Sequence, residues 1–119
     1  MTLGHPWQAP RAEPPLPAQF TRVVELGLVR LEPWLVLGDA CDRRELARYL
    51  ERRFPAAGLV PFARRRGSGL VAAWHGGPDL GPVVVFDPTA VDGWDARTEL
   101  ADFHAWLRGA VEDLILDFW

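Results

Sequence analysis

The chain contains a single cysteine, Cys41, so no internal disulfide can form. Neither this thiol nor the three histidines (His5, His75 and His104) stand at paired ligand spacing, which leaves no predicted zinc site. No apolar run approaches the roughly 18 residues that a membrane span needs. Met1 is not followed by a positively charged segment and then an apolar one, so we expect no secretory signal. These absences predict a cytoplasmic protein with no membrane contact, no metal and no cofactor.

Lysine and asparagine are absent, and Ile115 is the one isoleucine. All thirteen basic residues are arginine, a composition typical of a GC-rich bacterial genome. The net charge of −3 and the isoelectric point near 5.5 argue against nucleic-acid binding. The charge is uneven, because residues 1–78 carry a net +4 and residues 79–119 carry a net −7. The acidic last third either faces a basic protein partner or forms solvated loops and a solvated helix face.

The length of 119 residues and the apolar fraction of 49% suit one hydrophobic core. Five prolines in residues 1–17 forbid a helix there and predict an extended, proline-rich N-terminal arm. Residues 18–119 are then expected to form a single domain. At its start, apolar residues three and four apart predict a short helix from Ala18 to Leu26 that ends at Gly27, with a β-strand as the alternative.

A second helix is predicted from Asp42 onward. Glu45 follows Asp42 by three residues, a spacing that suits a capping box at a helix N-terminus. Pro55 cannot continue a helix and is expected to end it. One face of this helix carries an apolar stripe made of Leu46, Tyr49, Leu50 and Phe54.

Strands are predicted over residues 59–64, 70–75 and 83–86, which are rich in apolar and β-branched side chains. A short Gly-rich loop separates the first two, so we expect them to pair as an antiparallel hairpin. Pro61 lacks a backbone donor and is expected at a sheet edge or a strand start. Residues 34–37 predict either another short strand or a buried loop.

A long amphipathic helix is predicted at the C-terminus, with Thr98 and Asp102 as alternative N-caps. The order of elements predicts an α+β fold, with helices packed on a mainly antiparallel sheet. The stripe of the C-terminal helix consists of Leu100, Phe103, Trp106, Leu107, Ala110, Val111, Leu114 and Phe118.

No catalytic constellation emerges from the sequence. The Gly-rich segment 64–69 contains Ser68 but lacks the Lys-Ser/Thr of a P-loop and opens no helix, so we interpret it as a hairpin turn. His75 and His104 suit the base and the acid of a ribonuclease-like transfer if they share one cleft. Their positions, beside a turn and off the apolar stripe of a helix, equally suit ordinary exposed histidines.

Acidic residues gather around a predicted turn near residue 90. Asp87, Asp92 and Asp95 lack the ligand order of an EF-hand, so we expect no calcium or magnesium site there. Trp94 lies among them, and tryptophan is enriched at binding hot spots when it is exposed. These four residues form the candidate partner-binding site, with a solvated loop as the alternative interpretation.

Short apolar motifs recur along the chain in a characteristic order and spacing. They are Val-Val-Glu-Leu-Gly-Leu at 23–28, Leu-Glu-Pro-Trp at 31–34, Leu-Val-Pro-Phe-Ala-Arg at 59–64, Ala-Ala-Trp at 72–74, Val-Val-Val at 83–85, Gly-Trp at 93–94 and Phe-His-Ala-Trp-Leu at 103–107. In this order and spacing the motifs resemble the bacterial SUKH superfamily of the SMI/KNR type. The resemblance covers about residues 16–115 and departs at 67–69, where the sequence is Gly-Ser-Gly and the family often carries Gly-Asp or Asp-Asp.

The resemblance implies an α+β fold and a function in binding. Many members of the family look like immunity proteins that neutralise a cognate toxin, often a nuclease. We therefore expect a non-enzymatic protein-binding domain whose partner is such a toxin. A regulatory or scaffolding module of the same fold is the alternative, and a small histidine-dependent nuclease is the third hypothesis. The oligomeric state does not follow from the sequence.

Overall fold

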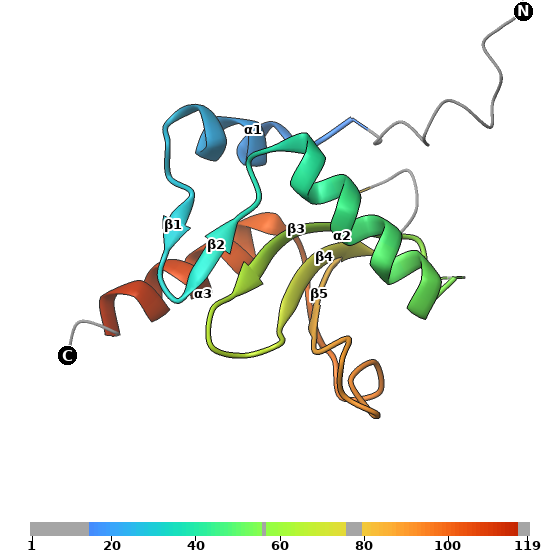
Figure 1. Ribbon diagram of the computed structural model, residues 1–119. Helices are drawn as coiled ribbons and strands as arrows, with labels where there is room; N and C mark the ends of the chain where they lie inside the picture. The colour runs from blue at the N-terminus through green and yellow to red at the C-terminus, as the bar shows by residue number, and fades with distance from the viewer. Residues whose placement is uncertain (1–14, 56, 76–79, 117–119) are drawn as a thin grey trace, which may run out of the picture.

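The computed structural model describes residues 15–55, 57–75 and 80–116, and within these ranges it contains a six-stranded antiparallel sheet and three helices. This architecture confirms the predicted α+β class. Every strand pairs with the next one along the chain, so the sheet is a meander in the order β1-β2-β3-β4-β5-β6 (Figure 1). The expectations for residues 1–14 of the arm and for Phe118 in the stripe of the C-terminal helix lie outside the described residues.

Helix α1 (Ala18–Glu25) confirms the predicted helix and rules out the alternative strand. It ends as predicted at Gly27, whose φ of 74° is a conformation that glycine adopts without strain. The backbone N–H of Leu28 donates to the carbonyl of Val23, and that of Gly27 donates to the carbonyl of Val24. These two bonds form a Schellman motif, which satisfies carbonyls that the end of a helix otherwise leaves open.

Strands β1 (Arg30–Leu31) and β2 (Trp34–Val36) form the next antiparallel pair. β2 confirms the strand interpretation of residues 34–37, whereas β1 was not predicted, because two residues are too short to display an alternating pattern. Helix α2 (Ala40–Arg53) follows and ends one residue before the predicted Phe54. Its end agrees with Pro55, which disfavours helical backbone at the residue before it.

The predicted start of α2 at Asp42 is wrong. Asp39 is the N-cap, and its carboxylate accepts a hydrogen bond of 2.6 Å from the backbone N–H of Cys41. Asp39 has extended backbone angles (φ −91°, ψ 128°), the usual conformation of an N-cap, whereas Asp42 already lies inside the first turn. The Asp-Glu pair at 42 and 45 is therefore a feature of the helix surface and not a capping box.

Strands β3 (Leu59–Arg65) and β4 (Val71–His75) form the expected hairpin, and β5 (Val83–Phe86) pairs with β4. The ladder between β3 and β4 shifts register between Pro61 and Ala63. Pro61 pairs with Ala73 of β4, whereas β2 pairs only with residues 63–65 of β3, so within the described residues no strand pairs with Pro61 on its other side. This position near the start of β3 agrees with the predicted edge or strand start, where proline is tolerated because its missing donor is not needed.

Strand β6 (Thr98–Leu100) precedes helix α3 (Phe103–Leu116). Of the two alternative caps, Asp102 is the one used, since its side chain accepts a 2.9 Å hydrogen bond from the N–H of Ala105. Thr98 starts β6, an element too short to be predicted. No helix in the described part of the chain is long and apolar enough to cross a membrane.

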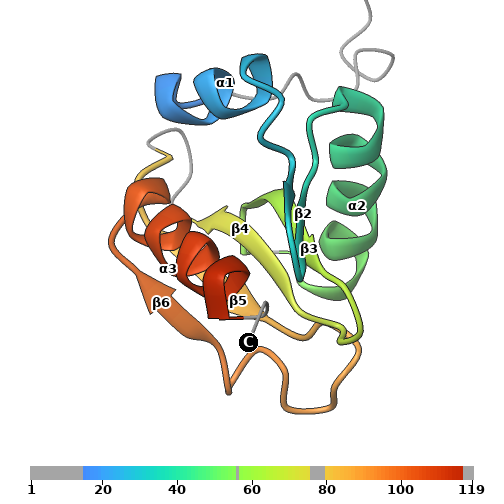
Figure 2. The ribbon, with the colours of Figure 1, turned by 90° about the vertical axis from the view of Figure 1, so that its left-hand side faces the viewer.

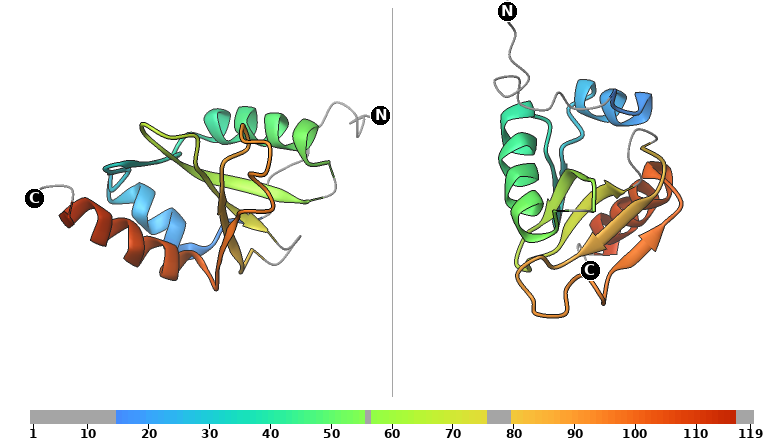
Figure 3. Two further views of the ribbon diagram at one scale, coloured as in Figure 1. Left: turned by 90° about the horizontal axis from the view of Figure 1, so that it is seen from below. Right: turned by 90° about the vertical axis from the view of Figure 1, so that its right-hand side faces the viewer.

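The sheet is covered on both faces, by α1 and α3 on one side and by α2 on the other (Figures 2 and 3). Because side chains alternate along a strand, Ala72 and Trp74 of β4 face α1 and α3, while Val71 and Ala73 face α2. Burial on both faces explains why the strands read as continuous apolar runs.

Aromatic rings dominate the core between the sheet and the α1–α3 layer. Phe62 packs against Trp74 and Trp106 with centroid separations of 4.5 and 4.9 Å. At the end of this core, the buried Arg43 donates a 2.8 Å hydrogen bond to the carbonyl of Leu37 and lies over the ring of Phe20. The core therefore fixes α1 and the first turn of α2 against the sheet, which sets the position of the α2 face described below.

Candidate functional site

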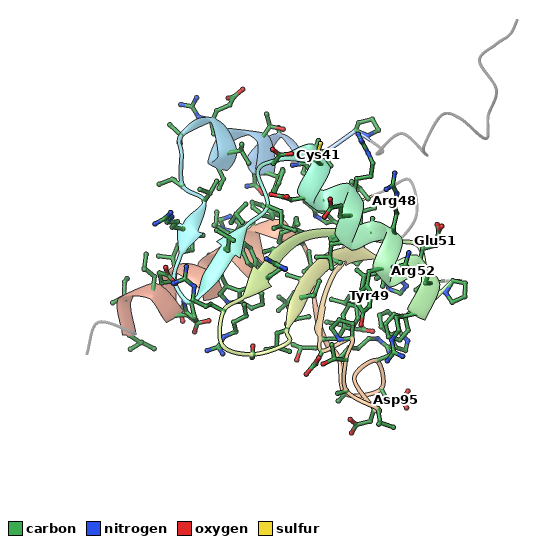
Figure 4. The ribbon with its side chains drawn as sticks, in the orientation of Figure 1. Cys41, Arg48, Tyr49, Glu51, Arg52 and Asp95 are labelled. Atoms are coloured by element: carbon green, nitrogen blue, oxygen red, sulfur yellow. The ribbon has the colours of Figure 1, made fainter. Side chains whose placement is uncertain are left out.

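The candidate site is the acidic loop, defined here as residues 87–97 between β5 and β6. It projects beyond the end of the sheet in two perpendicular views (Figures 1 and 2). Asp92 and Asp95 are exposed, and Val91 between the turns of the loop is fully exposed. Figure 4 shows Asp95 at the outer end of this loop. Two predicted site residues thus lie on the most prominent surface feature of this end of the fold.

Asp87 lies at the base of the acidic loop and has a structural role there. Its carboxylate accepts hydrogen bonds from the hydroxyl of Thr89 at 2.6 Å and from the backbone N–H of Thr89 at 2.9 Å. These two bonds, the hydroxyl first, lower the pKa of Asp87, because they stabilise the charged carboxylate. Asp87 also approaches Gly69 of the β3–β4 turn so closely that a Cβ at that glycine would collide with it.

Two further features hold the loop in one conformation. The guanidinium of Arg53 on α2 donates to the carbonyl of Pro88 at 2.8 and 3.1 Å, which connects the helix to the loop. The N–H of Gly93 donates to the carbonyl of Ala90 at 3.1 Å, and Gly93 packs directly on the backbone of Asp87. The loop is therefore ordered before any partner arrives, which lowers the entropic cost of binding.

Trp94 is half-buried, and its predicted exposure is corrected by the structure. Its ring packs against Phe54 at 5.6 Å and Phe86 at 5.2 Å, so most of the indole extends the core between the sheet and α2. The guanidinium of Arg97 lies 4.6 Å from the centroid of the indole. Burial of a large aromatic ring and this cation–π contact outweigh exposure, and Trp94 anchors the loop instead of forming its tip.

The two candidate catalytic histidines do not come together. His75 is half-buried and its ring packs edge-on against Trp94 at 5.4 Å, on the sheet face that carries α2. His104 is exposed on α3, which covers the opposite face. A base and an acid on opposite faces of a sheet cannot act on one phosphate, so this arrangement gives no support to a two-histidine transfer.

Ser68 and the neighbouring glycines form the hairpin turn that the sequence predicts. Gly67 has a φ of 79°, and the hydroxyl of Ser68 accepts a 3.4 Å bond from the N–H of Leu70. Arg66 is exposed and pairs with Glu32 at 3.3 Å. None of these contacts brings a general base to the serine, so they give no support to a catalytic role.

A groove of about 630 Å³ lies beside the acidic loop, and no sequence pattern predicts it. We name it the α2 groove. Its walls come from β2 and the residue after it, from α2, from the β3–β4 hairpin and from the start of the acidic loop, so that only the folded chain brings them together. The residues that line it are Leu35, Leu37, Asp42, Glu45, Leu46, Tyr49, Arg64, Arg65, Arg66, Ser68, Gly69, Leu70, Val71, Pro88 and Thr89.

Within the described ranges, no group of three or more His, Cys, Asp or Glu side chains is arranged to hold a metal ion. Cys41 is a free, exposed thiol. Comparisons of the chain with protein-family models, with curated proteins and with solved structures return no match.

Proposed function

We propose that this chain is a non-enzymatic protein-binding domain, an immunity protein that neutralises a cognate bacterial toxin by covering its active surface. The observation that carries the proposal is the pre-ordered acidic loop, which presents Asp92 and Asp95 on a projection anchored at Trp94. The resemblance of the sequence to the SUKH superfamily points to the same class of function.

The mechanism combines steric occlusion with charge mimicry. A nuclease binds phosphates in a basic cleft, and a convex element with two exposed carboxylates and the apolar side chain of Val91 is complementary to such a cleft. Because hydrogen bonds at Asp87 and Arg53 already fix the loop, little conformational entropy is lost on docking. The toxin is then held without any chemical step, in the cytoplasm where both proteins are made.

The test starts with capture of the partner. The tagged chain is incubated with lysate of its source organism, the protein bound in stoichiometric amount is identified, and its gene is expressed alone and together with this chain. We expect growth arrest by the partner alone and rescue by co-expression. A partner without toxicity would contradict the immunity function and would favour a regulatory or scaffolding module.

The contact surface is tested with charge reversal. The double variant Asp92→Lys/Asp95→Lys is expected to weaken binding of the captured partner by at least about tenfold, because two attractive contacts become repulsive. The control Glu25→Lys/Glu112→Lys makes the same change in net charge at exposed positions on α1 and α3, on the other side of the sheet. Equal losses from both double variants would contradict a role for the acidic loop.

A further inference from the structure

The α2 groove is lined by charged side chains of both signs. Arg64 is an exposed residue of β3 that lines the groove, and its neighbours across the ladders are Leu35 and Val71. Asp42 and Glu45 stand on the α2 wall. In the described part of the chain, none of these three charged side chains forms a hydrogen bond or an ion pair, with each other or with anything else.

The two walls of the α2 groove differ in chemistry. On α2, residues 42, 45, 46 and 49 follow the i, i+3, i+4, i+7 spacing of one helix face, so acidic groups, Leu46 and Tyr49 point along the same side. The opposite wall is the β3–β4 hairpin, which contributes three arginines beside Leu70 and Val71. They are Arg64, Arg65 and Arg66, the last of which pairs with Glu32. An occupant therefore meets an apolar strip with an anion-binding side and a cation-binding side.

This pattern selects one class of occupant. A polyanion such as a nucleic-acid backbone would be repelled by Asp42 and Glu45, and a purely cationic segment would be repelled by the three arginines of the hairpin. An extended peptide alternates its side chains every residue and can direct an acidic side chain, an apolar one and a basic one along one strip. A groove of this volume is large enough for several side chains.

We propose that the α2 groove binds an extended segment of the protein partner that carries an acidic side chain for Arg64 and a basic side chain for Asp42 and Glu45. The inference rests on the proposed function in that the segment belongs to the protein neutralised at the acidic loop. Pro88 and Thr89 connect the two surfaces, since they belong to the acidic loop and also line the groove. A partner seated on the loop therefore has the groove directly beside it.

The test uses synthetic peptides and needs no captured partner. Fluorescein-labelled peptides of about eight residues, long enough to span the groove as a strand, place one Glu and one Arg at varied separations among Val and Thr. Matched peptides carry Gln in place of one or both charged residues. Fluorescence polarisation gives the dissociation constants, and circular dichroism verifies that each protein variant is folded.

We expect the best peptide with both charges to bind at least about tenfold tighter than its uncharged counterpart, because charge-assisted hydrogen bonds form at both sides of the groove. Arg64→Gln should remove the advantage of the peptide's Glu and leave that of its Arg. Glu45→Gln should reduce the advantage of the peptide's Arg and leave that of its Glu.

Two matched controls separate the groove from general electrostatics. Arg48→Gln removes an exposed arginine from the outer side of α2, which Figure 4 shows directed away from the sheet, and Glu112→Gln removes an exposed carboxylate from α3. Both should leave all dissociation constants unchanged. Equal binding of charged and uncharged peptides, or equal effects of Arg48→Gln and Arg64→Gln, would overturn the proposal. If peptides bind as expected while no toxic partner is captured, the proposed function fails and the peptide site stands.

Discussion

Asp87, one of the predicted contact residues, also has a structural role. Its carboxylate is held by the hydroxyl and the N–H of Thr89, so the folded chain binds a proton at this group less readily than the unfolded chain does. The unfolded state then holds more protons in acid, and stability increases with pH across the titration range. The stabilisation is complete above the unfolded pKa and is lost as pH falls through the lowered pKa of the folded state.

Asp87→Asn should therefore reduce the acid dependence of the unfolding free energy. We expect urea denaturation to show the wild-type chain losing stability from about pH 5 downward, and the variant losing less over the same range. Asn can still accept from Thr89, so the loop keeps its conformation and the comparison isolates the charge. Identical pH profiles for the two proteins would show that the bonds to Thr89 do not stabilise the carboxylate.

Gly93 tests whether the order of the acidic loop matters for binding. A Cβ at this position would lie 2.8 Å from the carbonyl carbon of Asp87, and backbone atoms cannot rotate away as a side chain can. We expect Gly93→Ala to destabilise the fold by about 1–3 kcal/mol, as overpacking usually does, and to weaken partner binding. The control is Gly81→Ala, because a Cβ there meets nothing within 4 Å. Thermal denaturation and partner affinity are measured for both, and equal behaviour would contradict this role.

At the scale of elements, the helices offer a matched pair of glycines. Gly109 is exposed within α3 and has open space at its Cβ position, so Gly109→Ala should stabilise the chain by about 0.5–1 kcal/mol through lower entropy of the unfolded state. Gly27 ends α1 with φ of 74°, and Gly27→Ala should destabilise by about 1 kcal/mol because a Cβ disfavours that conformation. Chemical denaturation gives the change in the free energy of unfolding for each variant. If both substitutions stabilise the chain, or both destabilise it, the role given to one of the two glycines is wrong.

The length and burial of each helix or strand explain which elements could be predicted from the sequence. Strands β3, β4 and β5 were found within one residue of their ends, since burial on both faces produces apolar runs that turn residues interrupt. β1 and β6 were missed because two or three residues carry no readable period. The start of α2 was misplaced because Asp39 and Asp42 are both good caps, and only the backbone angles distinguish them.

Only the part of the candidate site that depends on local sequence was predictable. The exposure of Asp92 and Asp95 follows from their place in a turn segment that no apolar pattern occupies. The burial of Trp94 depends on Phe54, forty residues earlier, and on Phe86, which only tertiary packing brings against it. The α2 groove likewise exists only where four separate segments meet, so local sequence patterns carry no information about it.

On the scale of the whole molecule, the uneven charge of the sequence becomes an uneven surface. The acidic loop carries three aspartates against one arginine at one end of the sheet, whereas the outer side of α2 exposes Arg44, Arg48 and Arg52. A basic partner approaching such a molecule is attracted to the loop and repelled by the arginines, so it is oriented before contact. Orientation of this kind increases the rate of association more than it slows dissociation.

Salt provides the corresponding test. The Debye length falls from about 10 Å at 0.1 M salt to about 3 Å at 1 M, so the association rate of the captured partner should fall steeply with ionic strength. Asp92→Asn/Asp95→Asn should lower the rate at low salt and flatten its salt dependence, with a smaller change in the dissociation rate. Glu25→Gln/Glu112→Gln removes the same charge on the other side of the sheet and should keep a steep slope. Stopped-flow kinetics measures all three proteins, and equal slopes would mean that net charge alone, and not the position of the acidic loop, directs the encounter.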